Sequence, residues 1–285
     1  MFQRRAAGLP RLGIGISTEY GAAASPGALD VARLAQDRPD FAAFLEIGVE
    51  AAKGLDAAAR TWLAAGRAST YHFLDVNLDQ EEDFDDAWLA QVGALVAEMK
   101  PAWLCGDAGL WHFGERDRAH MLLLPPVLVD EAATDMARGV ARLREATGQE
   151  VLPENPPGSA FVGDLHLLEF FRRVVERADS GMLLDVAHLA MFQRALGHDP
   201  LFGLDAFPLD RIIELHVAGG VVRDTDGYPW IEDAHGTAVL DDTWLIYQHV
   251  VARAPNLRAV VFECERNAND GVLAGFQRIH DWWRP

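Results

Sequence analysis

Short apolar runs rich in β-branched residues alternate with longer amphipathic stretches along this 285-residue chain. Runs of the first kind predict strands, and the amphipathic stretches between them predict helices. Eight strands are expected, at residues 13–17, 42–48, 69–73, 101–106, 150–154, 181–186, 211–218 and 259–265. Strands that are apolar along their length are typical of a parallel sheet covered on both faces. The alternation therefore predicts an α/β fold, and the eight-fold count favours a (β/α)8 TIM barrel.

Helical periodicity is clearest over five of the stretches between these strands, residues 55–66, 83–100, 129–148, 164–179 and 241–254. Several begin at an aspartate, a natural N-cap, and the third ends before Gly148, a natural C′ residue. A doubly wound open sheet is the competing architecture, but GIGIS at 13–17 lacks the following glycines of a dinucleotide-binding turn. No linker, repeat or low-complexity tract divides the chain, so we expect one domain over residues 1–285.

The charge balance argues against a nucleic-acid partner. The chain has 25 basic and 43 acidic residues, a formal net charge of −18, and no basic stripe. No apolar run is long enough to cross a bilayer, and the basic N-terminal start lacks the apolar core of a signal peptide. Two cysteines, Cys105 and Cys264, cannot form a disulfide framework. We therefore expect a cytoplasmic protein that binds neither nucleic acid nor membrane.

Carboxylates and imidazoles recur where the predicted strands end, as in STYHF, VLPEN, MLLDVAH, IIELHV and VVFECE. In a barrel the C-terminal ends of the strands open into one mouth, so these side chains are expected to converge. Converging carboxylates repel one another unless bound cations neutralise them. The strand-end residues are His72, Asp107, Glu154, Asp185, His188, His216 and Glu263, and Asp233 and His235 follow in a predicted loop at 218–240.

The mixture of side chains indicates which metals such a site would take. Imidazole together with carboxylate suits first-row transition metals, whereas an all-oxygen site would suit magnesium or calcium. Asp185 and His188 form D-x-x-H after a strand, and Asp233 and His235 form D-x-H, where a tight turn can aim both at one ion. Asp107 could instead cap a loop. This is more than one ion needs, so we predict two or three metal ions at the C-terminal mouth.

Other polar residues near the strand ends have open roles. Glu46 could be a ligand, a residue that supports a ligand or a salt-bridge partner, and Glu50 lies beyond the same strand. Asn155 could orient a ligand, contact substrate or cap its turn. His112 is expected on the substrate side, within a long ordered loop at 106–126 over the mouth. No role is assigned to His120, His166, His198, His249 and His280.

Taken together, these motifs resemble a known family, the multinuclear non-heme iron-dependent oxidative enzymes, which include the iron subunit of methanobactin biosynthesis. The resemblance runs over nearly the whole chain. It is carried by GIGIS, FLEIGVE, His72, LLLPP before a long helix, PEN at 153–155, LLDVAHL, ELHVAGG, EDAHG followed by a helix with Trp244 and Tyr247, and FECER. The ELHVAGG element with a downstream D-x-H is the most specific of these.

The resemblance implies a xylose-isomerase-like TIM barrel with two or three irons, as Fe²⁺ and Fe³⁺. It implies that O2 is used to oxidise a cysteine, or a neighbouring residue, of a ribosomally made precursor peptide in natural product biosynthesis. A small partner protein would present the peptide. Carried over residue by residue, the ligands are His72, Asp107, Glu154, Asp185, His188, His216, Asp233, His235 and Glu263, with Asp107 and Glu154 also expected to be catalytic.

Two positions depart from the family pattern. Typical members carry a histidine in the second strand shortly before a Glu-Asn pair, whereas this chain reads EIGVE at 46–50. A histidine commonly follows the acidic residue after the fourth strand, whereas Ala108 follows Asp107 here. One metal position could therefore be altered or lost, and the departures leave open the number of irons and the particular oxidation.

Other functions remain open on the same barrel. Zinc or manganese in place of iron would suit a phosphodiesterase or another hydrolase, because metal-activated hydrolysis uses the same ligands. A sugar isomerase or epimerase would need a carboxylate mechanism, since Lys53 and Lys100, the only lysines, fall away from the mouth. A barrel that binds a partner without catalysis is a further alternative.

Overall fold

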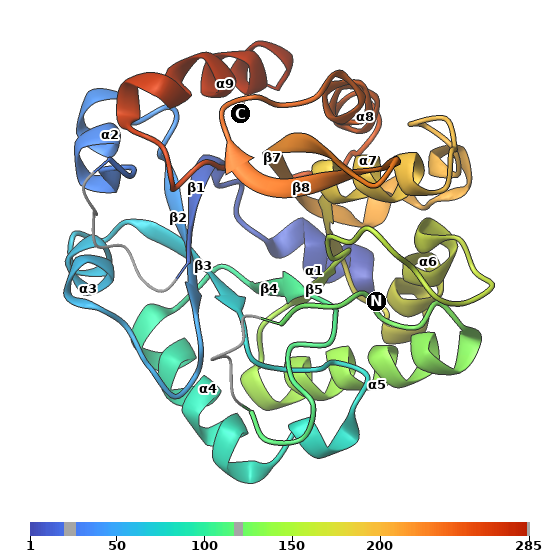
Figure 1. Ribbon diagram of the computed structural model, residues 1–285. Helices are drawn as coiled ribbons and strands as arrows, with labels where there is room; N and C mark the ends of the chain where they lie inside the picture. The colour runs from blue at the N-terminus through green and yellow to red at the C-terminus, as the bar shows by residue number, and fades with distance from the viewer. Residues whose placement is uncertain (20–26, 117–121, 284–285) are drawn as a thin grey trace.

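The computed structural model describes residues 1–19, 27–116 and 122–283. Within these ranges, eight parallel strands form a barrel surrounded by helices (Figure 1). They are β1 (Gly13–Glu19), β2 (Phe44–Val49), β3 (Ala68–Phe73), β4 (Leu104–Asp107), β5 (Val151–Glu154), β6 (Met182–Asp185), β7 (Ile212–Thr225) and β9 (Ala259–Glu263). Their order is β6-β5-β4-β3-β2-β1-β9-β7, and the pairing of β6 with β7 closes the ring. The predicted TIM barrel is confirmed.

The outer layer consists of helices that follow the barrel strands along the chain. They are α2 (Val31–Asp37), α3 (Ala57–Ala64), α4 (Asp86–Met99), α5 (Asp130–Thr147), α6 (Leu167–Ala178), α7 (Val186–Ala195), α8 (Asp241–Val251) and α9 (Asn269–Trp282). Asp56 and Asp85 cap α3 and α4 by accepting hydrogen bonds from backbone N–H groups, and α5 ends at Gly148 with φ 69°. Each of the five predicted helical ranges therefore contains a helix. No helix among the described residues combines the length and apolarity needed to span a membrane.

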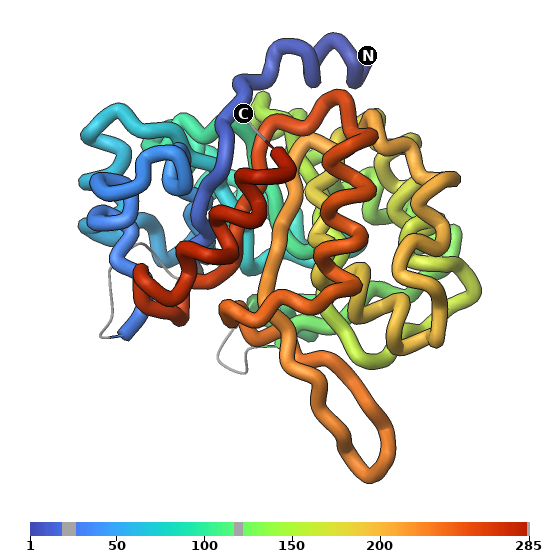
Figure 2. Tube along the Cα trace, turned by 90° about the horizontal axis from the view of Figure 1, so that it is seen from above, coloured from blue at the N-terminus to red at the C-terminus, as the bar shows by residue number. Residues whose placement is uncertain are grey.

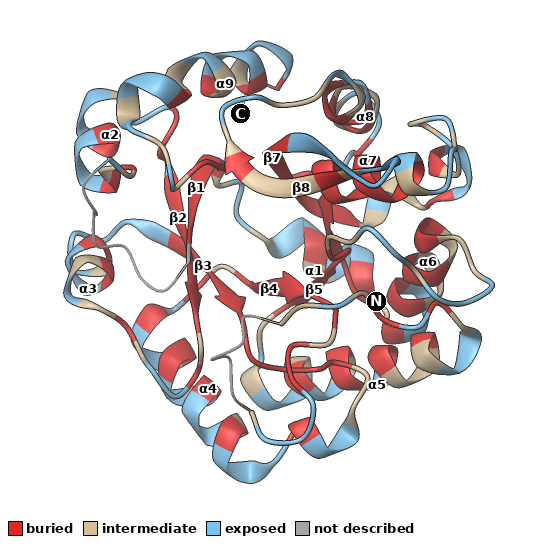
Figure 3. Ribbon diagram, viewed as in Figure 1, coloured by how far each residue is buried: buried red, intermediate tan, exposed pale blue. Residues whose placement is uncertain are grey.

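Inward-facing positions change from apolar to polar along the barrel strands. Read toward the mouth, the pairs include Phe44 and Glu46 on β2, Leu152 and Glu154 on β5, and Leu183 and Asp185 on β6. The apolar members form one cluster inside the barrel, and a larger apolar cluster fills the space between strands and helices. Figure 3 shows this arrangement as buried strands and buried inner helix faces, with exposure on the outside. The barrel interior is thus apolar at one end and polar at the other.

A short helix that the sequence analysis did not predict, α1 (Phe2–Gly8), covers the N-terminal end of the barrel. Phe2 and Ala6 are buried in the inner apolar cluster with Phe44 and Trp103. Figure 2 shows α1 at the end of the molecule opposite the hairpin of β7 and β8. The helix therefore covers the apolar end of the barrel and leaves the mouth to the polar end.

The prediction of a loop at 218–240 is wrong, because most of these residues belong to two paired strands. The chain continues β7 to Thr225 and returns as β8 (Tyr228–Gly236), which pairs antiparallel with β7. Asp226 and Gly227 connect the strands with φ 54° and 85°, as a tight two-residue turn requires. We call residues 219–236 the arm, and it projects beyond the mouth (Figure 2).

Candidate metal centre

Nine side chains named from the sequence come together at the mouth of the barrel. They are His72, Asp107, Glu154, Asp185, His188, His216, Asp233, His235 and Glu263, and we call them the donor cluster. Barrel strands β3 to β7 and β9, the first turn of α7 and the arm each contribute to it. The convergence follows from the parallel barrel, because every barrel strand ends at the same edge.

Glu154 lies at the centre of the donor cluster and contacts three imidazoles. Its Oε2 lies 2.9 Å from Nε2 of His72. Its Oε1 lies 3.2 Å from Nδ1 of His216 and 3.8 Å from Nδ1 of His188. A carboxylate placed in this way can bridge two metal ions through its two oxygens.

Further contacts extend the donor cluster on either side of Glu154. Nδ1 of His216 also lies 3.3 Å from Oε1 of Glu263. Nε2 of His188 lies 3.7 Å from Oδ2 of Asp185, and its Nδ1 lies 3.8 Å from Oδ1 of Asp107. Two ligand atoms that each lie about 2.0–2.2 Å from one metal are themselves separated by about 3–3.6 Å. The spacings of His216 from Glu154 and Glu263, 3.2 and 3.3 Å, match the edges of a coordination shell.

The arm supplies Asp233 and His235 from its returning strand. Oδ2 of Asp233 lies 3.3 Å from Nε2 of His188 and 3.0 Å from Nε2 of His235. The backbone of His235 has φ 46°, a left-handed conformation that is uncommon for residues other than glycine. This backbone conformation directs the imidazole toward Asp233 and Glu263. The backbone strain at His235 is therefore located at the donor cluster.

Two residues beside the donor cluster hold its members in place. The amide of Asn155 donates to the Asp185 carbonyl at 2.9 Å and accepts from the Asp185 N–H at 3.0 Å. The Asn155 carbonyl lies 2.9 Å from Nδ1 of His188, which leaves Nε2 facing Asp185 and Asp233. Oε1 of Glu265 lies 2.7 Å from Nδ1 of His235. The sequence analysis did not name Glu265, although it stands two residues beyond Glu263 in FECER.

Two inward-facing carboxylates lie below the donor cluster. Oε1 of Glu46 lies 3.0 Å from Nε2 of His216. Glu214, two residues before His216 on the same strand, accepts a hydrogen bond of 2.6 Å from the Trp103 indole. Burial raises the pKa of Glu214 to about 8. The sequence analysis did not name Glu214, although strand alternation places positions 214 and 216 on one face.

Two further residues named from the sequence, Glu50 and His112, make their contacts away from the donor cluster. Glu50 forms an ion pair of 2.7 Å with Lys53. His112 is buried, with Nε2 3.0 Å from Asp83 and Nδ1 3.0 Å from the Gly114 carbonyl. His112 belongs to the loop after β4, of which residues 117–121, including His120, lie outside the described residues. In the described part of this loop, the Trp111 indole donates to the Asp107 carbonyl at 3.0 Å and holds the loop against the barrel mouth.

The donor atoms themselves show whether metal ions fit between them. Among the described residues, several buried carboxylate oxygens have no hydrogen-bond partner: Asp107 Oδ1, Asp185 Oδ2, Asp233 Oδ1 and Glu263 Oε2. Leaving buried polar atoms unpaired is costly unless something else satisfies them. Carboxylates and imidazoles within reach of one another form the sets His72–Asp107–Glu154, Glu154–Asp185–His188 and Glu46–His216–Glu263. The residues present fit more than one cation, with Glu154 shared between two sets.

Protonation compensates for part of the negative charge of the metal-free cluster. Burial raises the pKa of Asp185 to about 8, and it also raises the pKa of Asp107 well above its usual range. For His72, burial lowers the pKa, but the Glu154 hydrogen bond and neighbouring carboxylates outweigh this and raise it to about 9. Burial opposes ionisation of Glu154, yet His216 and His72 hold the pKa of its carboxyl well below its usual range. A bound cation would compete with protons for these atoms.

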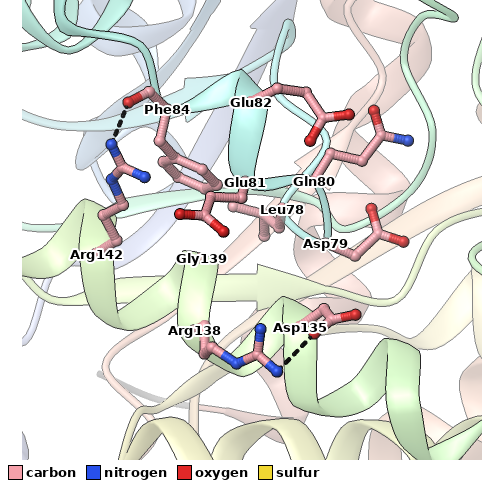
Figure 4. Close-up of a pocket in the computed structure, with 10 residues that line it drawn as sticks. All are labelled: Leu78, Asp79, Gln80, Glu81, Glu82, Phe84, Asp135, Arg138, Gly139 and Arg142. Carbon is pink, nitrogen blue, oxygen red and sulfur yellow. Dashed lines mark hydrogen bonds and ion pairs between the residues drawn. The ribbon is translucent and has the colours of Figure 1, made fainter.

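A separate pocket of about 550 Å³ lies on the outer surface, between the segment after β3 and helix α5 (Figure 4). Leu78 and Phe84 line it together with acidic side chains and Arg138. Arg138 pairs with Asp135 at 2.9 Å. No member of the donor cluster lines this pocket, so the two features are distinct.

Fold and site together define a TIM barrel with a carboxylate–imidazole cluster of the metal-binding type at its mouth. The family model described as "RiPP precursor modification enzyme MbnB/TglH/ChrH" matches residues 28–279. The chain therefore belongs to the MbnB/TglH/ChrH family of enzymes that modify ribosomally synthesised peptide precursors. The family resemblance stated from the sequence is confirmed.

Two relatives show how far the similarity extends. The UPF0276 protein of Vibrio parahaemolyticus is 30% identical over 278 residues, covering 93% of this chain and 90% of the relative. The UPF0276 protein of Anaeromyxobacter sp. (strain Fw109-5) is 29% identical over 194 residues, covering 67% of this chain and 66% of the relative. The first of these matches spans nearly the whole barrel.

Solved structures resemble the fold at much lower sequence identity. A xylose isomerase-like TIM barrel protein from Mycobacterium smegmatis, in complex with magnesium, has a TM-score of 0.59 and 11% identity, covering 97% of this chain and 98% of that chain. The 3-keto-D-glucoside 4-epimerase YcjR from E. coli has a TM-score of 0.54 and 17% identity, covering 95% and 98%. These likenesses establish the xylose-isomerase-like form of the barrel.

Proposed function

We propose that this protein is a multinuclear non-heme iron enzyme that uses O2 to oxidise a cysteine, or a neighbouring residue, of a ribosomally made precursor peptide. The observation that carries the proposal is the position of Glu154, whose two oxygens contact His72 on one side and His216 and His188 on the other. Membership of a family of peptide-modifying enzymes supports a peptide as substrate. Bound iron would supply the redox chemistry that activates O2.

The donor cluster divides into two groups of residues on the two sides of Glu154. Asp185, His188, His216 and Glu263 lie around it, and the arm completes this side with Asp233 and His235. His72 and Asp107 form the remaining set with Glu154. We propose this second set as the part of the centre with the fewest protein ligands, and therefore the part most open to substrate.

Asp107 and Glu154 are proposed to act in the reaction as well as in metal binding. Asp107 is 8% exposed and lies at the end of β4, where the loop after that strand begins. Because burial raises the pKa of its carboxyl, Asp107 would take up a proton close to a bound peptide whenever it is released from a metal ion. Glu154 stays ionised and keeps the imidazoles on its two sides oriented.

The mouth side of the barrel also carries exposed apolar side chains on three separate elements. Phe113 is 66% exposed in the loop after β4, Val162 is 69% exposed in the loop after β5, and Tyr228 is 51% exposed on the arm. The Tyr228 hydroxyl donates to the Ser159 carbonyl, so the arm contacts the loop after β5. We propose that a peptide, and a small partner protein that presents it, bind on this side.

The proposal is tested with protein purified and loaded with Fe²⁺ without oxygen, then mixed with a cysteine-containing precursor peptide encoded beside its gene. We expect two or three irons per chain by elemental analysis and an O2-dependent change in the peptide's mass. His216→Ala should lose iron and the mass change while the barrel's circular dichroism persists. Retention of zinc with phosphodiesterase activity, or of sugar epimerase activity, in place of peptide oxidation would overturn the assignment.

A further inference from the structure

His216 lies in the barrel with its two ring nitrogens facing different layers. Its side chain is fully buried. Nδ1 faces the donor cluster, 3.2 Å from Glu154 and 3.3 Å from Glu263. Nε2 faces away from the mouth and lies 3.0 Å from Oε1 of Glu46. The imidazole is therefore held between the donor cluster above it and the Glu46 carboxylate below it.

Glu46 belongs to a lower layer of the barrel than the residues of the donor cluster. On β2 it pairs with Thr70 of β3, whereas His72 pairs with Gly48. Strand alternation puts positions 46 and 48 on the same inward face, with position 46 one layer farther from the mouth. Glu46 therefore reaches His216 from beneath.

Two neighbouring strands fix the carboxylate of Glu46. Its Oε2 accepts a hydrogen bond of 3.2 Å from the Thr70 hydroxyl and one of 3.0 Å from the Cys105 thiol. All three side chains are buried. With Oε2 occupied on both sides, Oε1 is the oxygen left to face His216.

We propose that Glu46 is a positioning residue that fixes the ring orientation of His216, so that Nδ1 binds metal and Nε2 carries the proton. The inference rests on the metal centre proposed above. Glu46 was left open by the sequence and lies within reach of a possible metal set with His216 and Glu263. We place it outside the metal shell because its Oε1 faces the ring nitrogen of His216 that is turned away from the donor cluster. Carboxylates that hold the far nitrogen of a ligating imidazole set its tautomer and strengthen it as a ligand. Thr70 and Cys105 hold Glu46 in turn, so the support extends across β2, β3 and β4.

A glutamine at position 46 separates this role from simple filling of space. Its amide keeps the shape of the side chain but has one acceptor oxygen, which cannot accept from Thr70, Cys105 and His216 with the strength of a carboxylate. Whichever partner is lost, the force that holds Nε2 protonated is weakened. Glu150→Gln is the matched control, because Glu150 is also a buried carboxylate, paired with Arg5 at 2.7 Å at the opposite end of the barrel.

The experiment measures metal affinity by chelator competition and the His216 ring nitrogens by ¹⁵N NMR, using full-length protein loaded with Zn²⁺ as a diamagnetic probe. Wild type should show a metal-bound Nδ1 and a protonated Nε2. Glu46→Gln should bind Zn²⁺ and Fe²⁺ roughly 10- to 100-fold more weakly and show a mixed His216 signal. Glu150→Gln should match wild type in both measurements.

Wild-type affinity together with an unchanged His216 signal in Glu46→Gln would overturn the role of Glu46. Should that variant fail to fold, Thr70→Val and Cys105→Ala each remove one support of Glu46. Each is then expected to weaken metal binding in the same direction by a smaller factor, and no change in either would equally overturn the proposal. A wild-type protein that takes up no metal would overturn the metal centre itself, which distinguishes the two failures.

Discussion

Gly48 pairs with His72 across β2 and β3, so the position of β2 that lies beside this imidazole has no side chain. Both positions face into the mouth, because Glu46 and Thr70, two residues earlier, form the inward pair below them. EIGVE, the segment that departs from the family pattern, therefore lies beside the possible metal set formed by His72, Asp107 and Glu154.

A histidine at position 48 should strengthen metal binding beside His72. We expect Gly48→His to raise the iron content of anaerobically loaded protein by up to one ion per chain, because it adds an imidazole beside His72. Elemental analysis and Mössbauer spectroscopy would measure the gain. Ala43→His, at an exposed position just before β2, is the control that adds a histidine away from the mouth. Equal iron in Gly48→His and Ala43→His would show that position 48 lies outside the reach of the metal.

Removing the central carboxylate should affect the whole centre and not one ion alone. Glu154→Gln is expected to weaken Fe²⁺ binding at least about tenfold and to reduce the iron count by more than one, since Glu154 belongs to two of the possible metal sets. Glu145→Gln, on the exposed face of α5, serves as the control. Loss of a single ion with the remainder bound at wild-type affinity would contradict a shared role for Glu154.

Metal affinity should rise with pH across the neutral range. Ligands bind metal in their deprotonated forms, and metal-free His72 and Asp185 have pKa values of about 9 and about 8. Below pH 8 both are protonated, so metal binding releases their protons and protons compete with the metal. We expect log affinity for Fe²⁺ to increase by up to about two per pH unit between pH 6.5 and 8 and to level off above 9. Chelator competition under nitrogen would measure this, and a flat profile would contradict it.

Two helical glycines should respond oppositely to replacement by alanine. A Cβ at Gly139 of α5 would lie 2.0 Å from the Leu78 carbonyl and 2.8 Å from the Phe84 ring, so Gly139→Ala should destabilise the fold by about 1–3 kcal/mol. A Cβ at Gly93 of α4 would meet nothing within 4 Å. Gly93→Ala should therefore stabilise by about 0.5–1 kcal/mol. Chemical denaturation of the two variants tests this contrast, and a destabilised Gly93→Ala would refute it.

The barrel and the donor cluster could be predicted because each corresponds to a pattern that repeats along the sequence. Val151–Glu154 and Met182–Asp185 each run from apolar residues to a carboxylate, and such runs recur at intervals that helices fill. In a parallel barrel the end of every strand faces the same mouth, so a residue's place along its strand was enough to bring these side chains together. No distance information was needed for that step.

The remaining features depend on three-dimensional contacts or on local turn signals. Asp226-Gly227 between alternating residues is a strong hairpin signal, yet the arm was interpreted as a loop. Helix α1 is too short to show a periodicity of its own, and it is stabilised by Phe2 packing into the barrel. The roles of Glu46 and Glu214 depend on which side chain lies across the barrel from them, a relationship that strand order alone does not give.

Two of the nine donor-cluster residues lie on the arm and not on the barrel itself. Asp233 and His235 come from β8, whose single sheet neighbour is β7, whereas the other members stand on barrel strands or on the first turn of α7. Ions that contact both parts would act as a clasp between hairpin and barrel. Metal binding would then change the rate of proteolysis, because a protease that cuts near Asp226 and Gly227 would cleave the hairpin faster without metal than with metal bound.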